Sequence, residues 1–229
     1  MISIKLDCRL ETIASMVRTG SSVIDIGTDH GYLPCWLIQN KIAKKAIAGD
    51  VRPMPLQSAV NTIKLSGLED KISAVLSDGL HNIPENSGDT IILAGMGGML
   101  IAEILSKKDW IKKENIEIIA QPMTHAEKTR EYFIDNGFEI KEEKGCFSSG
   151  HYYCVIRAVY SGKVQTHEKG YIYYGKLKDN EDEFSKEYLK GQLKRLQKRY
   201  YALKENSLDP NECEYLSEII EDFQKNTKI

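Results

Sequence analysis

The chain has 229 residues, of which 41% are hydrophobic and 28% are charged, and its formal net charge is −2. This length suits one domain with an appendage, and the apolar fraction is too high for a disordered chain. No apolar run reaches the roughly 18 residues that a membrane-spanning helix needs, and the small net charge gives no support for a nucleic-acid partner.

Residues 10 to about 160 alternate short apolar runs with stretches of helical pattern. Because the early runs are continuous, we predict parallel strands that are covered on both faces. Five such strands are expected at residues 22–26, 46–50, 72–76, 90–94 and 116–120. Two longer strands at 138–147 and 152–160 leave no room for a helix between them and should pair antiparallel. The pattern predicts a doubly wound α/β sheet that is mostly parallel, with an antiparallel last strand.

Helix signals lie between these strands. A helix is expected over residues 33–38, and another ends at Gly67. Thr124 and Glu127 form a capping box that should open the next helix, which the Asn-Gly pair at 136–137 closes.

The strand signal disappears after about residue 165. Leucines recur at steps of three and four through residues 189–203 and predict a long helix. The segment 206–210 should break this helix, because it ends in an Asp-Pro pair.

A second helix should follow, with Asp209 as its N-cap, Pro210 at its first position and Glu212 completing a capping box. The two helices would form an antiparallel, coiled-coil-like helical hairpin. We therefore divide the chain into a domain that contains the sheet, residues 1–162, and a C-terminal helical domain, residues 163–229.

The cysteines are odd in number and include no CxxC pair, which favours reduced thiols over disulfides or a metal site. The first fourteen residues carry acids and an arginine where a signal peptide needs an apolar stretch. We therefore expect a cytoplasmic protein that binds no metal and no membrane.

The segment from Asp25 to Gly31, DIGTDHG, joins a predicted strand to a predicted helix. Such a turn lets a ligand approach the glycine backbone at a helix N-terminus. Asp29 stands where the dinucleotide motif has its second glycine, and its carboxylate would repel a pyrophosphate. S-adenosylmethionine fits, because it carries a sulfonium and an ammonium and no phosphate. The alternative is an acidic turn without a ligand.

Acids also follow the next two predicted strands. Asp50 lies 23 residues after Gly27, a spacing at which a carboxylate accepts hydrogen bonds from ribose hydroxyls, although it could simply cap the next helix. Asp78 would face the adenine edge of the ligand. Because the carboxyl ends of parallel strands meet at one edge, these acids should converge on one site.

The fourth strand runs into Ala94-Gly-Met-Gly-Gly98, whose three glycines leave backbone groups open beside the expected methyl donor. We favour contact of this backbone with a target base over simple close packing.

Several segments together carry a resemblance to a known family: DCRLETIAS, DIGTDHGYLP, SDGL, AGMGG and the pair Gln121-Pro122. Over nearly its full length the chain resembles the bacterial tRNA (adenine-N1)-methyltransferases of the TrmK-like family, which modify adenine 22 of tRNA. The resemblance implies a Rossmann-like class I methyltransferase fold, S-adenosyl-L-methionine as cofactor and tRNA as substrate. The cofactor site that it implies comprises Arg9, Asp25, Gly27, Thr28, Asp29, His30, Gly31, Asp50, Val51, Asp78, Gly79, Ala94, Gly95, Met96 and Gly97.

Adenine N1 has an in-plane lone pair and needs no deprotonation before it attacks a sulfonium methyl group. The site must align donor and acceptor at roughly 3 Å and must stabilise the cationic base or remove its N6 proton. Asp29 or His30 is expected to act as the catalytic group near the target base, with Met96 and Tyr32 packed against it. Asp78 is a further candidate, and a structural role is the alternative for His30.

The predicted long helix carries a net charge of +6 over residues 186–204. We expect five of its cations to bind RNA phosphates, namely Lys190, Lys194, Arg195, Lys198 and Arg199. A solvated helix face or a self-associating coiled coil is the alternative.

Two other functions are compatible with these residues. A methyltransferase of small metabolites would use the same cofactor site, with the hairpin as a dimer element. A non-catalytic S-adenosylmethionine-binding module would keep the pocket as a scaffold, although the intact set of acids argues against such decay. We expect a monomeric enzyme that modifies tRNA.

Overall fold

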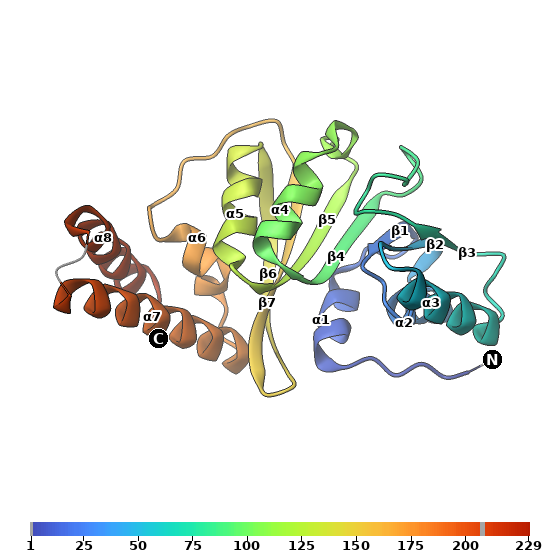
Figure 1. The fold of residues 1–229 in the computed structure, drawn as a ribbon, viewed down its shortest axis with the longest axis horizontal. Coiled ribbons are helices and arrows are strands. Elements are labelled where there is room, and N and C mark those ends of the chain that lie inside the picture. Colours follow the sequence, from blue (N-terminus) through green and yellow to red (C-terminus); the bar gives the residue numbers. More distant parts are fainter. Residues whose placement is uncertain (1, 207–208) are drawn as a thin grey trace.

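A sheet of seven strands forms the centre of the computed structural model, which describes residues 2–206 and 209–229 (Figure 1). The strands are β1 Ser21–Ile26, β2 Ala43–Asp50, β3 Ile72–Leu76, β4 Thr90–Gly97, β5 Glu117–Thr124, β6 Phe138–Ser148 and β7 His151–Tyr160. They lie in the order β3-β2-β1-β4-β5-β7-β6. β1 to β5 are parallel, whereas β7 runs antiparallel to β5 and β6. The predicted sheet, including its antiparallel end, is confirmed.

Helices cover both faces of this sheet, and each face has its own apolar core. Side chains of successive strand residues point to opposite faces, so Val23 joins one core and Ile24 the other. One face carries α1 Cys8–Met16, α2 Tyr32–Gln39 and α3 Pro53–Ser66. The other carries α4 Gly98–Ser106, the 3₁₀ turn η1 Asp109–Ile111 and α5 Ala126–Asp135.

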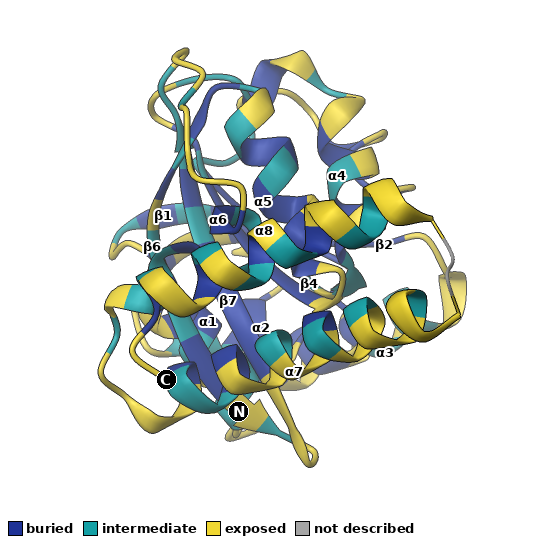
Figure 2. Ribbon diagram, turned by 90° about the vertical axis from the view of Figure 1, so that its left-hand side faces the viewer, coloured by how far each residue is buried: buried dark blue, intermediate teal, exposed yellow. Residues whose placement is uncertain are grey.

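The C-terminal extension is helical, as predicted. Its elements are α6 Tyr171–Tyr174, the 3₁₀ turn η2 Gly175–Asp179, α7 Glu183–Glu205 and α8 Pro210–Asn226. α7 and α8 pack against each other as the predicted hairpin, beside the sheet (Figure 1). Each of the two helices has a buried face (Figure 2). Leu196 and Phe223 belong to the same core as α4 and α5. Two residues of the predicted break, Ser207 and Leu208, lie outside the described residues, and the domain boundary at residue 162 stays a prediction.

The predicted capping box at Thr124 is wrong. Thr124 pairs with Gly97 and belongs to β5, and the N-cap of α5 is His125, in a left-handed conformation with φ of 52°. The Glu127 carboxylate contacts the His125 ring at 3.0 Å and accepts from Arg195 at 3.1 Å. The Glu127 carboxylate, which the local pattern assigned to a capping box, therefore binds Arg195 of α7 instead.

The second predicted cap is confirmed in part. The Asp209 side chain accepts a hydrogen bond from the Glu212 amide at 3.1 Å and caps α8. The Glu212 carboxylate is paired with Arg199 of α7, so it joins the two helices of the hairpin.

A buried ion pair attaches the extension to the sheet. Arg130 Nε donates to Glu143 Oε1 at 2.7 Å, and both side chains are fully buried. Arg130 Nη1 also donates to the carbonyl oxygens of Ile172 and Tyr173, at 2.9 and 3.3 Å. A Cβ on Gly175, whose φ is +55°, would overlap the Glu143 carboxylate. Removing one partner of a buried ion pair lowers the unfolding free energy by about 3–5 kcal/mol, because the other charge is left buried and unpaired. The contact of Arg130 with Glu143 and with α6 therefore holds the extension at this place on the sheet.

Within residues 2–206 and 209–229, no helix is both long and apolar enough to cross a bilayer. The same residues hold no group of three His, Cys, Asp or Glu side chains arranged to bind a metal ion. All five cysteines, Cys8, Cys35, Cys146, Cys154 and Cys213, are free thiols.

Candidate active site

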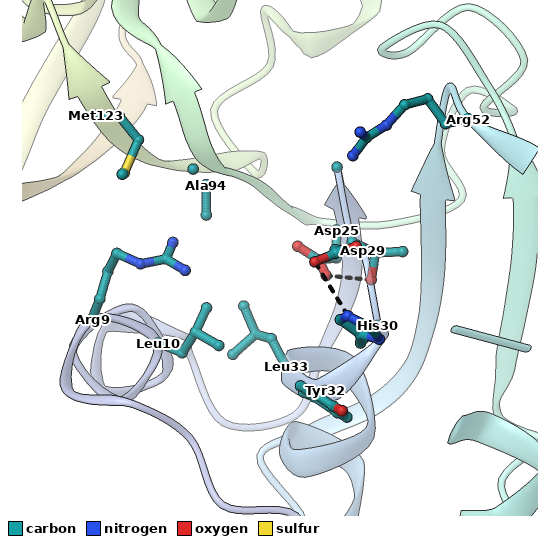
Figure 3. A pocket seen from close by; sticks show the side chains of 13 residues that line it. Arg9, Leu10, Asp25, Asp29, His30, Tyr32, Leu33, Arg52, Ala94 and Met123 are labelled. Carbon is teal, nitrogen blue, oxygen red and sulfur yellow. Dashed lines mark hydrogen bonds and ion pairs between the residues drawn. The ribbon is translucent and has the colours of Figure 1, made fainter. Parts of the chain in front are cut away.

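A pocket of about 450 Å³ opens at the carboxyl ends of β1 and β4 (Figure 3). The strand order reverses between these two strands, and this is the place where open α/β sheets bind ligands. We call it the active-site pocket, and it is lined by Arg9, Leu10, Asp25, Gly27, Thr28, Asp29, His30, Tyr32, Leu33, Arg52, Ala94, Gly95 and Met123. Most of the residues of the predicted DIGTDHG turn therefore lie in one cavity.

The turn after β1 depends on two glycines. Gly27 has a φ of +76°, and a Cβ there would collide with the methyl group of Met96. Gly31 has a φ of +69° and is the N-cap residue of α2, packed against Ala59. Asp29, between them, also has a positive φ of 52°, which is strained for a residue with a Cβ. The turn brings the backbone close to the pocket at a helix N-terminus.

Asp25 is a buried carboxylate at the base of the pocket. It accepts a hydrogen bond from the Thr28 hydroxyl at 2.7 Å. Burial raises the pKa of Asp25 from 3.8 to about 6, while the Thr28 hydroxyl and the positive charge of Arg9 act in the opposite direction. A cationic ligand group beside this carboxylate would favour its charged form.

Asp50 ends β2 next to the same turn. Its carboxylate is 4% exposed and accepts from the backbone amides of Asp29, at 3.3 Å, and of Arg52, at 2.9 Å. These two bonds hold the turn after β1 against the end of β2. A carboxylate has about four lone-pair positions, so acceptor capacity is left for hydroxyl groups of a ligand.

Arg9 enters the pocket from α1 on the side opposite Asp25 and Asp29 (Figure 3). Its Nη1 donates to Gln121 Oε1 at 2.8 Å, and the same oxygen accepts from the Gly95 amide at 3.0 Å. Gln121 is fully buried. One amide side chain of β5 therefore positions both the guanidinium and the carboxyl end of β4. The sequence pattern included Gln121 only as part of a motif and indicated no role for it.

His30 and Tyr32 form the exposed mouth of the pocket. Their rings stack with centroids 5.2 Å apart and an interplanar angle of 13°. His30 Nε2 lies 3.7 Å from Asp29 Oδ2. Met96 is partly buried beneath Gly27 and does not line the pocket directly. The two candidate catalytic groups, Asp29 and His30, are thus adjacent and accessible to a large substrate.

Other predicted residues lie farther from the pocket. Asp78 lines a separate cavity beside Ile104 and Lys107, and a Cβ on Gly79 would overlap Ile104. Val51 is exposed at the end of β2.

The glycines at the end of β4 and the start of α4 have different structural roles. The Gly95 amide is bound by Gln121, and Gly97 is the last residue of β4. A Cβ on Gly98 would overlap the His125 carbonyl oxygen, so close packing accounts for this glycine. The expected contact with a target base therefore stays a prediction for residues 95–97.

Sequence analysis missed four of the pocket residues, Leu10, Leu33, Arg52 and Met123. They follow or flank the motifs but carry no signal of their own.

The five predicted RNA-binding cations do not share one environment. Arg195 binds Glu127 at 3.1 Å, and Arg199 pairs with Glu212. Lys190 pairs with Glu187 at 2.6 Å, one turn away on α7. Lys194 and Lys198 are exposed and form no ion pair with the described residues.

Comparison with known proteins places this geometry among methyltransferases. Residues 6–156 match a family model described as "Methyltransferase domain". A tRNA (adenine(22)-N(1))-methyltransferase of Bacillus subtilis is 38% identical over 159 residues, which span 69% of this chain and 66% of that protein. The crystal structure of the B. subtilis M1A22 tRNA methyltransferase TrmK has a TM-score of 0.86 at 28% identity and covers 98% of this chain and 99% of that chain. Streptococcus pneumoniae Sp1610 in complex with S-adenosyl-L-methionine has a TM-score of 0.80 at 30% identity, over 95% of this chain and 97% of that chain.

Proposed function

This chain belongs to the methyltransferase family whose model covers residues 6–156, and on that premise we propose that it transfers a methyl group from S-adenosyl-L-methionine to N1 of adenine 22 in tRNA. The B. subtilis relatives, which are named for this reaction, support the choice of target. We further propose that the protein acts as a monomer in the cytoplasm, where tRNA is available.

Two buried carboxylates at neighbouring strand ends, faced by an arginine, carry the proposal. Asp25 would hold the ammonium group of the methyl donor, and Arg9 its carboxylate, because each then meets an opposite charge. Asp50 would accept from the ribose hydroxyls, for which it has unused lone pairs. The backbone at Gly27, which tolerates no Cβ, leaves room for a ligand to lie against it.

The remaining proposed contacts surround the adenine and the methyl group. Asp78 and Gly79, after β3, and the exposed Val51 are proposed for the adenine of the donor. The amide and carbonyl groups of residues 94–97, together with Thr28 and Gly31, complete the proposed cradle. Their alignment with a ligand rests on their position at the ends of β1 to β4.

When bound, S-adenosyl-L-methionine supplies a methyl group activated by a positively charged sulfur, and adenine N1 receives it with a lone pair that needs no deprotonation. The chain must hold both partners in line and offer an acceptor for the N6 proton of the cationic product. Asp29 and His30, adjacent at the open mouth of the pocket, are the proposed acceptors. Tyr32, stacked on His30, and Met96, beneath Gly27, would restrict where the adenine can lie.

The helical hairpin is the proposed tRNA-binding arm, through Lys190, Lys194, Arg195, Lys198 and Arg199. Phosphate binding makes affinity depend steeply on salt, because each phosphate that a cation neutralises adds about one to the slope of log affinity against log salt. Charge reversal at Lys194 and Lys198 should therefore weaken tRNA binding and flatten its salt dependence. Unaltered affinity would count against an RNA-binding hairpin.

Transfer of a labelled methyl group to a tRNA transcript tests the reaction itself. The label should appear as 1-methyladenosine in a transcript with adenine 22 and should be absent from a matched transcript with guanine 22. Label that enters small metabolites of a cell extract but never tRNA would favour the metabolite methyltransferase. Calorimetry without donor binding would favour a non-catalytic module in which a degenerate pocket serves only as a scaffold.

A further inference from the structure

A second cavity, of about 440 Å³, lies between the catalytic domain and the C-terminal helices. We call it the hairpin cavity. One wall comes from α4 and α5 and the other from α6, α7 and α8, and the residues that matter here are Met99, Glu127, Tyr173, Arg195, Arg199 and Tyr215. Its volume falls in the range of pockets that bind small ligands.

The hairpin cavity lies at the same edge of the sheet as the active-site pocket. Met99 is the second residue of α4, which begins directly after β4, and Gly95 of β4 lines the active-site pocket. Likewise, Met123 lines the active-site pocket, and His125, two residues later, lines the hairpin cavity. Because a polymer substrate extends beyond its reacting nucleotide, it can occupy both cavities at once.

Three cations line the hairpin cavity, and each of them has an acid partner. Lys128, Arg195 and Arg199 lie beside two acids of the lining, Glu127 and Glu131, and Arg199 pairs with Glu212, which does not line the cavity. Each acid is already paired with one of these cations, Glu127 with Arg195 and Glu131 with Lys128.

The guanidinium groups keep donors free for a ligand. A guanidinium has five N–H donors, and in the contacts between described residues only the Nη2 group of Arg195 and of Arg199 is engaged. The Glu127 carboxylate, whose pKa is lowered by its own backbone amide, by Arg195 and by His125 against the effect of burial, anchors the Arg195 side chain. Arg195 is therefore held in place with unused N–H groups, an arrangement that suits bidentate phosphate binding.

Aromatic and apolar side chains occupy the rest of the lining. Tyr215 is 43% exposed, Met99 is 64% exposed, and Tyr173 is partly buried and packs against the core. An aromatic ring beside a guanidinium is the combination on which unpaired nucleic-acid bases stack.

We propose that the hairpin cavity binds a nucleotide of the tRNA that flanks the methylated adenine, with its phosphate at Arg195 and Arg199 and its base against Tyr215. This inference rests on the proposed function. Adenine N1 is on the Watson–Crick edge, so the target base must leave its pair and stack, and a held neighbour offsets part of that cost. Arg195 and Arg199 then act inside a cavity, whereas Lys194 and Lys198 contact the outer phosphates.

A matched pair of tyrosines tests the proposal. Tyr215→Ala removes the ring from the cavity, and Tyr201→Ala removes an exposed ring of α7 that does not line it. In Tyr215→Ala, the Kd for unmodified tRNA transcript, measured by fluorescence anisotropy, and the KM for tRNA should both rise by about fivefold or more. Both constants should stay within about twofold in Tyr201→Ala. Affinity for S-adenosyl-L-methionine should be unchanged in both variants.

Photo-crosslinking locates the nucleotide without a substitution. Transcripts with 4-thiouridine beside adenine 22 should crosslink to peptides of α6 or α8 that contain Tyr173 or Tyr215. Crosslinks confined to other elements, or a Tyr215→Ala variant with the Kd and KM of the wild type, would overturn the proposal. The proposed function would still hold in that case if the wild-type protein methylates tRNA. Failure of the wild type to methylate tRNA would instead remove the proposed function. Should Tyr215→Ala fail to fold, Arg195→Lys, which keeps the charge facing Glu127 but loses the planar fork, should weaken tRNA binding in the same assay.

Discussion

Asp25→Asn should stabilise the protein near neutral pH and abolish binding of the methyl donor. Burial raises the pKa of Asp25 from 3.8 to about 6, so the native state retains this proton to a higher pH than the unfolded chain does. Stability from this group is therefore fully present below about pH 4 and is lost as the pH rises through about 6. The shift corresponds to about 3 kcal/mol at pH 7.5, roughly half of it lost between pH 5 and pH 7.5. Asparagine has no charge to bury and keeps an oxygen that can accept from Thr28.

Urea unfolding of both proteins near pH 5 and pH 7.5 measures this difference. Relative to Asp25→Asn, the wild type should lose about 1–2 kcal/mol of unfolding free energy between the two pH values. Calorimetry should find no donor binding to the variant, and donor affinity of the wild type should fall about tenfold at pH 5, because protonated Asp25 no longer attracts an ammonium group. A stability difference that is equal at both pH values, or wild-type donor affinity in the variant, would refute the reasoning.

Substitutions at three further positions have defined outcomes. Gly27→Ala should lower the unfolding free energy by about 1–3 kcal/mol, because residue 27 has a positive φ, and should lower donor affinity by at least about tenfold. Wild-type donor affinity of this variant in calorimetry would argue against a donor that lies on the backbone at Gly27. Gln121→Leu removes the acceptor that positions Arg9, so it should lower the unfolding free energy by about 1–3 kcal/mol and raise KM for the donor. Gln121→Glu keeps an acceptor oxygen and should return KM most of the way to the wild-type value. If Gln121→Glu has the same KM as Gln121→Leu, Gln121 does not position Arg9. Arg130→Met leaves Glu143 buried and unpaired and should lower the unfolding free energy by about 3–5 kcal/mol, and an unchanged thermal midpoint would exclude a stabilising role for the pair.

The sheet was predictable because its strands are short, continuous apolar runs. The runs of β1, β4 and β5 are buried on both faces, which leaves a signal that does not depend on distant residues. The turn after β1 was also predictable, because Gly27 and Gly31 occupy left-handed positions that glycine tolerates. Local patterns therefore indicated most of the residues that line the active-site pocket.

Features that depend on distant partners escaped prediction. Gln121 meets Arg9 across 112 residues of sequence, and Glu127 meets Arg195 across 68. No local pattern records such pairings, and for Glu127 the local pattern indicated a cap instead.

A crystal structure with bound S-adenosyl-L-methionine tests the central claim most directly. The ammonium group of the ligand should lie beside Asp25, its carboxylate toward Arg9, and its ribose within hydrogen-bonding distance of Asp50. Density for the ligand away from residues 25–31 and Asp50, or a dinucleotide bound there in preference to it, would contradict the account.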